Sequence, residues 1–106
     1  MNLRNDLLKK EIKEIIDNGT ESKLIWGILE LQEAKHFDML NQDENKIVQS
    51  LQEKLIKKVS VEKLIALYKD MRSKRDSKFE IYTMTLDLQA CIAERIIELK
   101  GKEFKF

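Results

Sequence analysis

Apolar residues recur at helical spacing from the start of the chain. Leu8, Ile12 and Ile15 are four and three positions apart, which puts them on one stripe of an α-helix. The full stripe consists of Leu3, Leu7, Leu8, Ile12, Ile15 and Ile16, with lysines and glutamates on the opposite side. Asn18 and Gly19 come next, and a glycine in the left-handed conformation commonly ends a helix. The pattern predicts a first helix that faces a core and ends at Gly19.

Two more helices are predicted over residues 20–55. Thr20 is a suitable N-cap for the second helix, which we expect to end near Leu40. Asn41 and Glu44 have the spacing of a capping box, which predicts the start of a third helix. The positions predicted to face inward are Leu24, Ile25, Trp26, Ile28, Leu31, Ala34, Phe37 and Leu40 in the second helix and Ile47, Val48, Leu51 and Leu55 in the third.

The apolar pattern in the second half of the chain predicts a fourth helix and a long last helix. Ser60 can cap the fourth helix, and the apolar stripe changes phase at residues 59–61, which favours a break over one continuous helix. The polar residues 72–76 predict a turn, with Asp76 as the cap of a last helix that Gly101 ends. Inward positions are Val61, Leu64, Ile65, Tyr68 and Met71 in the fourth helix.

The last helix is apolar on two sides. One stripe consists of Phe79, Tyr82, Leu86, Ala93 and Ile97, and the other of Met84, Leu88, Ile92, Ile96 and Leu99. Such a helix normally lies between its neighbours, so we expect the first stripe to share one core with the first helix. Residues 81–88 also alternate with a period of two, but a lone strand has nothing to pair with, so a helix is favoured.

Composition supports a helical fold. The 106 residues include no proline and 3 glycines, and few chain breakers favour few, long elements over a sheet with many turns. Hydrophobic residues make up 42% of the chain, which is too much for a disordered protein. The sequence therefore predicts an all-α fold, a compact bundle of four to five helices that forms a single domain over residues 1–106.

Charge is unevenly distributed along the chain. Residues 1–53 carry 7 Lys/Arg and 11 Asp/Glu, whereas residues 54–106 carry 13 and 8. This asymmetry can mean a dimer contact or a basic face for an anionic partner. The competing interpretation, which we favour, is two solvated faces. No signal peptide is recognisable and no apolar run reaches the length of a membrane span, so the cytoplasm is expected, without membrane insertion.

Residues that usually carry catalysis are scarce. Glu33 and His36 have the Glu-x-x-His spacing of helical metal sites, but di-iron bundles need that motif twice and His36 is the single histidine. Cys91, the single cysteine, has no CxxC neighbour for zinc and is interpreted as a small core residue. Phosphate-binding loops and GxSxG motifs are missing. The sequence predicts a protein that is not an enzyme and binds no metal or cofactor.

Two places are candidates for binding a partner. Trp26 and Gly27 lie together in the second helix, where Trp26 could anchor a partner that approaches closely at Gly27, or where another helix of the chain packs; we favour the second interpretation. The densest group of basic residues, called the basic cluster below, consists of Lys69, Arg72, Lys74, Arg75 and Lys78. With Tyr68 and Phe79 flanking it, the cluster could contact a nucleic-acid backbone, although a solvated turn between helices is the favoured alternative.

Three segments carry a resemblance to a known family: Leu8–Lys13, Lys23–Ile28 and Asp43–Lys58. An acidic pair opens the third segment, which ends in a Lys-rich Leu-Ile-Lys-Lys sequence. The arrangement over residues 3–80 resembles the helical start of YqeY-type proteins, relatives of the tail domain of the GatB subunit of tRNA-dependent amidotransferase. The family's Gly-Arg-x-Asp turn has only Arg75-Asp76 as a counterpart, without the glycine, and its Tyr-Leu-Pro segment is absent.

The resemblance implies a helical, tRNA-associated module whose basic cluster faces RNA. Two other interpretations remain open. Lys-rich helical bundles of this size are similar to bacteriocin immunity proteins, and small chains without catalytic residues are typical of phage or mobile-element proteins that bind and modulate a host protein. In every case a non-catalytic module binds a macromolecular partner, protein or RNA, and a homodimer is left open.

Overall fold

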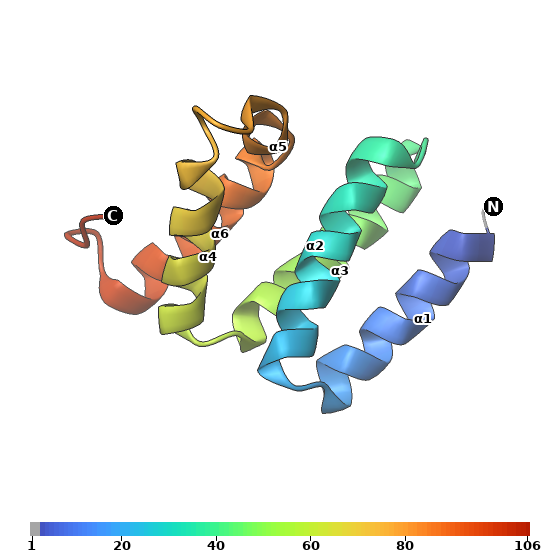
Figure 1. The fold of residues 1–106 in the computed structure, drawn as a ribbon. Coiled ribbons are helices and arrows are strands. Elements are labelled where there is room, and N and C mark those ends of the chain that lie inside the picture. Colours follow the sequence, from blue (N-terminus) through green and yellow to red (C-terminus); the bar gives the residue numbers. More distant parts are fainter. Residues whose placement is uncertain (1–2) are drawn as a thin grey trace. The chain divides into compact units, whose positions relative to one another are not determined.

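Six helices make up the part of the chain that is described. A computed structural model describes residues 3–106, with side chains from Asp6 onward. The helices are α1 (Leu3–Asn18), α2 (Glu21–Phe37), α3 (Gln42–Lys58), α4 (Val61–Ser73), α5 (Phe79–Met84) and α6 (Leu86–Lys100), shown in Figure 1. These residues contain no strand, which confirms the all-α prediction. The predicted number of four to five helices is too low, because the segment predicted as one long last helix forms two helices, α5 and α6.

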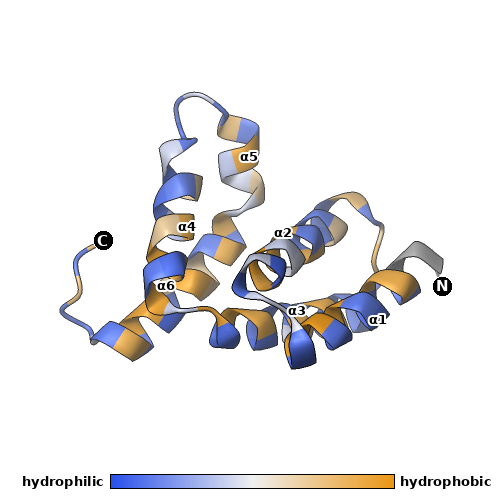
Figure 2. Ribbon diagram, turned by 60° about the horizontal axis from the view of Figure 1, so that its bottom comes forward, coloured by the Kyte–Doolittle hydropathy of each residue, from blue (hydrophilic) through white to orange (hydrophobic). Residues whose placement is uncertain are grey.

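Contacts within the chain define two compact units, Met1–Val59 and Ser60–Phe106. Unit 1 contains α1, α2 and α3, and unit 2 contains α4, α5 and α6. The first helix and the stripe that includes Tyr82 therefore belong to different units. The single domain predicted for residues 1–106 stays a prediction. In each unit hydrophobic and hydrophilic positions alternate around the helices (Figure 2).

Gly27 marks the point where the three helices of unit 1 meet. A Cβ atom on Gly27 would lie 2.8 Å from Cδ1 of Ile12 on α1 and 3.1 Å from Cδ1 of Leu55 on α3. Both side chains are fully buried, so a larger residue at this position has no room without displacing them. Packing within the chain, the favoured interpretation of Gly27, is confirmed.

A buried amide pair joins α2 to α3. Gln52 is fully buried, and its Nε2 donates to the carbonyl of Ile28 at 3.0 Å and to Oε1 of Gln32 at 3.1 Å. Lys35 donates from Nζ to Oε1 of Gln52 at 3.4 Å and to Oε1 of Gln49 at 2.8 Å. Buried polar groups cost little when they are hydrogen-bonded, and their geometry fixes the register of the two helices.

The helix starts in unit 1 agree with the sequence-based predictions, whereas two details of the helix ends differ. The predicted caps are confirmed: Thr20 accepts from the amide of Lys23 at 3.3 Å, and Asn41 and Glu44 form a capping box. Gly19 does not take the predicted left-handed conformation. Its small size matters instead, because a Cβ atom would lie 2.6 Å from the carbonyl oxygen of Ile15. The second helix ends at Phe37 instead of near Leu40.

The break between α5 and α6 lies at Thr85. Its backbone (φ −109°, ψ 9°) leaves the helix, and its hydroxyl lies 3.1 Å from the carbonyl oxygen of Ile81 and 3.2 Å from that of Tyr82. Gln89, which is buried, donates from Nε2 to the Thr85 hydroxyl at 2.9 Å and to the Tyr82 carbonyl at 3.2 Å. This polar group satisfies the carbonyls that the break leaves open.

The core of unit 2 uses one of the two predicted stripes. Leu88, Ile92 and Ile96 of α6 and Leu64 of α4 are fully buried, and Met71 of α4 is also buried. The C-terminal residues return to α4, where the ring of Phe106 lies 4.8 Å from that of Tyr68. Gly101 ends α6 with a positive φ of 95°, as its place in the sequence predicts.

Several positions predicted to face inward are exposed. In unit 1 these are Leu7, Trp26, Phe37 and Ile47, and in unit 2 they are Phe79, Leu86 and Leu99. Leu86 is exposed because it begins α6 on a different face from the buried Leu88, Ile92 and Ile96. The predicted inward position of Leu3 lies outside the described side chains. Asp76 does not cap the helix that follows: α5 begins at Phe79, with Lys78 in the N-cap position.

Candidate functional site

The basic cluster extends over the end of α4 and the turn that leads to α5. Lys69 and Arg72 lie in α4, Lys74 is the residue that ends it, Arg75 lies in the turn, and Lys78 precedes α5. All except the half-buried Lys74 are exposed. The basic cluster therefore lies on the last part of α4 and on the connection from α4 to α5, which Figure 1 shows.

An aromatic pair lies inside this group. The guanidinium of Arg72 is 5.7 Å from the ring centroid of Tyr82, and Nη1 donates to the Tyr82 hydroxyl at 3.1 Å. The ring of Phe79 stacks beside that of Tyr82, with centroids 6.1 Å apart and planes 24° apart. Phe79 keeps 60% of its surface exposed. The turn thus brings a cation, a phenol and an open ring into one row, called the Arg72–Phe79 row below.

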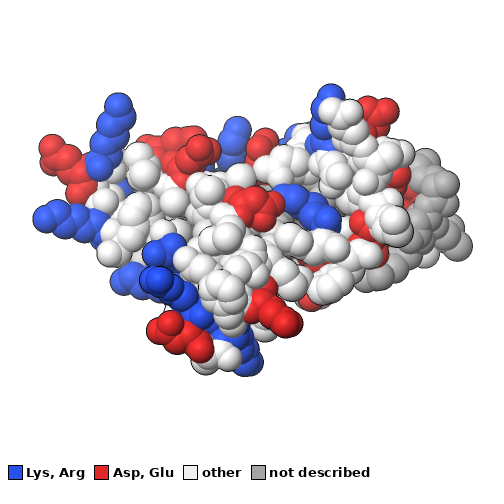
Figure 3. All heavy atoms as spheres, turned by 90° about the horizontal axis from the view of Figure 1, so that it is seen from above, with Lys and Arg blue, Asp and Glu red and all other residues white. Residues whose placement is uncertain are grey.

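Acidic residues dilute the charge of the basic cluster. Asp70 accepts from Nζ of Lys74 at 2.8 Å, which leaves that lysine partly neutralised. Over whole units the asymmetry is also small: residues 1–59 carry 10 Lys/Arg and 11 Asp/Glu, and residues 60–106 carry 10 and 8. The two halves of the sequence differ more strongly in charge because a division after residue 53 cuts α3. The lysines at the end of α3 are then counted with the second half instead of with unit 1. On the face drawn in Figure 3, acidic and basic groups are interspersed.

Comparison with known proteins adds no relative. No protein family matches the chain, and neither a curated protein nor a solved structure matches it. The contacts and charges of the chain's own residues therefore carry the functional argument.

The second candidate, Trp26, borders a hollow in unit 1. Between α1 and α2, Glu11, Ile15, Ser22, Lys23 and Trp26 line a space of about 370 Å³. Trp26 is 40% exposed, so its ring is half covered by the chain and half open. A rigid aromatic ring at the edge of a hollow is typical of binding surfaces.

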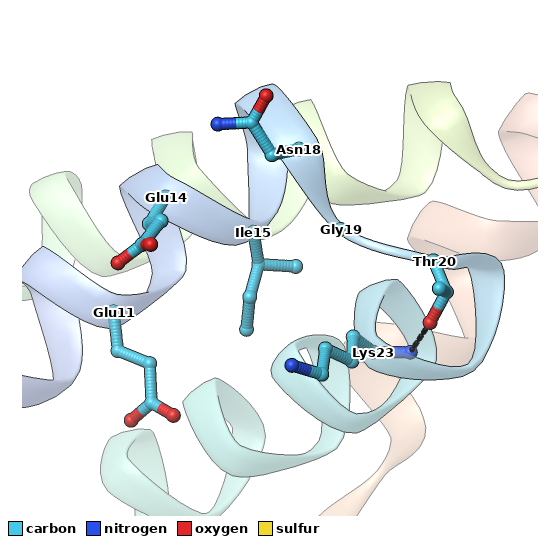
Figure 4. A pocket seen from close by; sticks show the side chains of 7 residues that line it. All are labelled: Glu11, Glu14, Ile15, Asn18, Gly19, Thr20 and Lys23. Carbon is cyan, nitrogen blue, oxygen red and sulfur yellow. Dashed lines mark hydrogen bonds between the residues drawn. The ribbon is translucent and has the colours of Figure 1, made fainter.

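A neighbouring hollow of about 220 Å³ shares three of these residues, Glu11, Ile15 and Lys23. It adds Glu14 and the short connection from Asn18 to Thr20. Figure 4 shows Glu11 and Lys23 projecting from facing helices on either side of the Ile15 side chain. The two hollows share part of their lining, and the surface they form together, with Ile15 and Trp26 as its large apolar residues and Glu11, Glu14 and Lys23 as its charged ones, is called the α1–α2 groove below.

The residues considered for metal or thiol chemistry do not line the α1–α2 groove and do not belong to the basic cluster. His36 and Glu33 are exposed on α2, and Cys91 is half-buried on α6. Within residues 3–106, no three His, Cys, Asp or Glu side chains are arranged to hold a metal ion. Every helix in that range is too short or too polar to cross a membrane.

The sequence pointed to the five basic residues, with Tyr68 and Phe79 flanking them, but not to Tyr82, which joins Phe79 and Arg72. Phe79 and Tyr82 were interpreted as core positions because their spacing fits an apolar stripe. One signal could have identified them: they begin the segment directly after the basic turn, three positions apart, so both return toward Arg72 when the turn closes. The buried amides Gln32, Gln52 and Gln89 had no recognisable signal.

Proposed function

We propose that the protein is a non-catalytic binding module that contacts RNA through the basic cluster and the Arg72–Phe79 row. The observation that carries the proposal is the placement of Arg72 over Tyr82, with Phe79 stacked beside it. Unstacked bases bind to aromatic rings and to guanidinium planes, and neighbouring lysines contact phosphates. The resemblance to YqeY-type proteins supports the same class of partner, and such a module would work in the cytoplasm, where tRNA is found.

The residues of the basic cluster have different roles in this proposal. Lys69, Arg75 and Lys78 are exposed and contact phosphates. Arg72 is held by Tyr82, so it contributes a fixed plane more than a mobile charge. Lys74 contributes least, because Asp70 pairs with it at 2.8 Å.

A charge-reversal experiment tests the proposal. Binding of fluorescently labelled tRNA is measured by anisotropy over a range of salt concentrations. Arg72→Glu combined with Arg75→Glu should lower the affinity at least about tenfold, because the Arg72 plane and the Arg75 phosphate contact are lost and two repulsive charges are added. The matched control is Lys46→Glu combined with Lys54→Glu, which makes the same charge change at exposed positions of α3 in unit 1.

The control should change the affinity by no more than about threefold, as expected for a general effect of net charge. Equal losses in both double variants would mean that tRNA responds only to total charge. Unchanged binding in the Arg72 and Arg75 variant would remove the basic cluster from consideration. Either result contradicts the proposal.

A protein partner is the second candidate, because Trp26 stands half open beside the α1–α2 groove. This is the function expected of a phage or mobile-element protein that modulates a host protein, or of a bacteriocin-immunity-like bundle. Charge reversal in the basic cluster would then slow association, and replacing Trp26 would speed dissociation, because electrostatic steering and buried anchors act on different rates. A homodimer stays a prediction.

A further inference from the structure

The α1–α2 groove is part of a longer strip of exposed side chains on unit 1. Leu7 lies one turn before Glu11 on the same face of α1, and it keeps 61% of its surface exposed. On α2, Glu30 and Phe37 lie about one and three turns beyond Trp26 on the same face. Since α1 and α2 are consecutive helices in contact, Leu7 on α1 and Trp26 and Phe37 on α2 border the same strip. From Trp26 to Phe37 the strip follows about three turns of α2.

Acidic residues outnumber basic ones on this strip. Glu11 and Glu14 line the groove from α1, and Glu30 and Glu33 lie beyond Trp26 on α2. The basic residues are Lys23, which lines the groove, and the exposed Lys10, one turn before Glu14. Unit 1 as a whole carries 10 Lys/Arg and 11 Asp/Glu, so the acidic character belongs to this face and not to the unit. An acidic rim around apolar groups favours a partner with the opposite charge pattern.

We propose that the α1–α2 groove binds a basic amphipathic helix of a partner protein. The apolar stripe of that helix packs on the exposed side chains of Trp26, Leu7 and Phe37. Its Lys and Arg side chains lie against Glu11, Glu14 and Glu30. Helix-in-groove recognition uses this combination of apolar anchors at helical spacing and flanking charges. The acidic rim repels phosphates, so the groove is unsuited to RNA, and this inference is independent of the proposed RNA-binding surface on unit 2.

A synthetic peptide serves as the probe. It forms about five helical turns, with Leu on one face and Lys on the other, and it carries a fluorescent label. Trp26 is the single tryptophan of the protein, so its emission reports on the groove itself. Binding should shift this emission to shorter wavelengths, and the peptide's anisotropy should rise in the same concentration range. High salt should weaken the binding.

Two comparisons separate the groove from a general attraction between opposite charges. Glu11→Lys combined with Glu14→Lys should weaken peptide binding at least about tenfold. Glu94→Lys combined with Glu103→Lys, which makes the same charge change at exposed positions of unit 2, should change it by no more than about twofold. A peptide of identical composition with scrambled order should bind at least about tenfold more weakly, because its Leu side chains no longer share a face.

Four results would overturn the inference. The first is that the two double variants weaken peptide binding equally, and the second is that the scrambled peptide binds as tightly as the ordered one. The third is that the peptide binds without changing Trp26 emission. The fourth is that a peptide with Glu in place of Lys binds as tightly as the Leu/Lys peptide. A shift of Trp26 emission caused by RNA, or by the protein's own concentration in the absence of peptide, would assign the groove to RNA or to a second copy and contradict the inference as well. Circular dichroism of each variant confirms that the helices remain, so that a loss of binding reports on the groove.

Discussion

The Cδ1 atom of Ile12 lies 2.8 Å from the position that a Cβ atom would take on Gly27. Gly27 costs α2 about 1 kcal/mol relative to alanine in helix propensity, and the close approach of α1 explains why the chain tolerates that cost. The Cδ1 atom of Leu55 on α3 lies 3.1 Å from the same Cβ position. The absence of a side chain at Gly27 therefore lets Ile12 and Leu55 pack directly against α2.

The first prediction concerns this contact. Gly27→Ala should lower the free energy of unfolding by about 1 kcal/mol, because overpacking in a close-packed core outweighs the gain in helix propensity. Ile12→Val removes the Cδ1 atom that the new methyl group meets. The double variant should therefore be more stable than the sum of the two single effects by at least about 0.5 kcal/mol. Urea unfolding followed by Trp26 fluorescence measures all three variants, and strict additivity would mean that the added methyl group finds room elsewhere.

The second prediction compares two apolar positions of the same helix. Ile12 is fully buried, so Ile12→Ala should cost about 2–5 kcal/mol of unfolding free energy. Leu7 is mostly exposed, so Leu7→Ala should change it by no more than about 0.5 kcal/mol. Equal effects at the two positions would show that the rotation of α1 is different from the one described.

The third prediction concerns the buried amide pair. Gln52→Leu leaves Oε1 of Gln32 without the donor that now lies 3.1 Å away, which should cost about 1–3 kcal/mol. Gln32→Leu combined with Gln52→Leu removes both polar groups and should recover part of that loss, because no buried amide is then left with a broken bond. Urea unfolding of the single and double variants measures the difference. A double variant less stable than Gln52→Leu would mean that Gln32 is held mainly by other contacts.

The fourth prediction concerns the break between α5 and α6. Thr85→Val keeps the shape of the side chain and removes the hydroxyl that accepts from Gln89 at 2.9 Å. Because Gln89 is buried, the change should cost about 1–2 kcal/mol, measured by urea unfolding followed by circular dichroism. Thr83→Val is the matched control: its hydroxyl also bonds to a backbone carbonyl, that of Glu80, but it is exposed to solvent and should cost less than about 0.5 kcal/mol.

Helical periodicity identified the elements and much of the core, but not the rotation of every helix. The stripe of α1 was correct at Ile12 and Ile15 and wrong at Leu7, since six apolar residues cover a wider arc than two neighbouring helices bury. The predicted inward positions of Phe37 and Ile47 were wrong for the same reason. The apolar pattern continues across Thr85 and therefore did not predict the break there. That break depends on hydrogen bonds between side chains and carbonyls, which the apolar pattern does not reflect.

The candidate sites were predictable in part. Local density of charge identified the basic cluster, and the rarity of tryptophan drew attention to Trp26. The Arg72–Tyr82 contact joins residues ten positions apart across a turn, and its formation depends on where α5 begins, which the sequence placed at the wrong residue. The groove beside Trp26 requires α1 and α2 to approach closely, and Gly27 was the one sequence signal of that approach.

The last prediction separates stacking from charge on the proposed RNA surface. Phe79→Ala should weaken binding of unstructured RNA by about 1–3 kcal/mol if one base stacks on its exposed ring, and it should leave the salt dependence unchanged, since no charge is lost. Lys78→Ala should instead flatten the slope of log affinity against log salt by about 0.7. Phe37→Ala, which removes another exposed phenylalanine in unit 1, is the control and should leave RNA binding unaltered. A normal affinity for Phe79→Ala together with a flattened slope for Lys78→Ala would mean that RNA is held by charge alone. Base stacking on the Arg72–Phe79 row would then have to be abandoned.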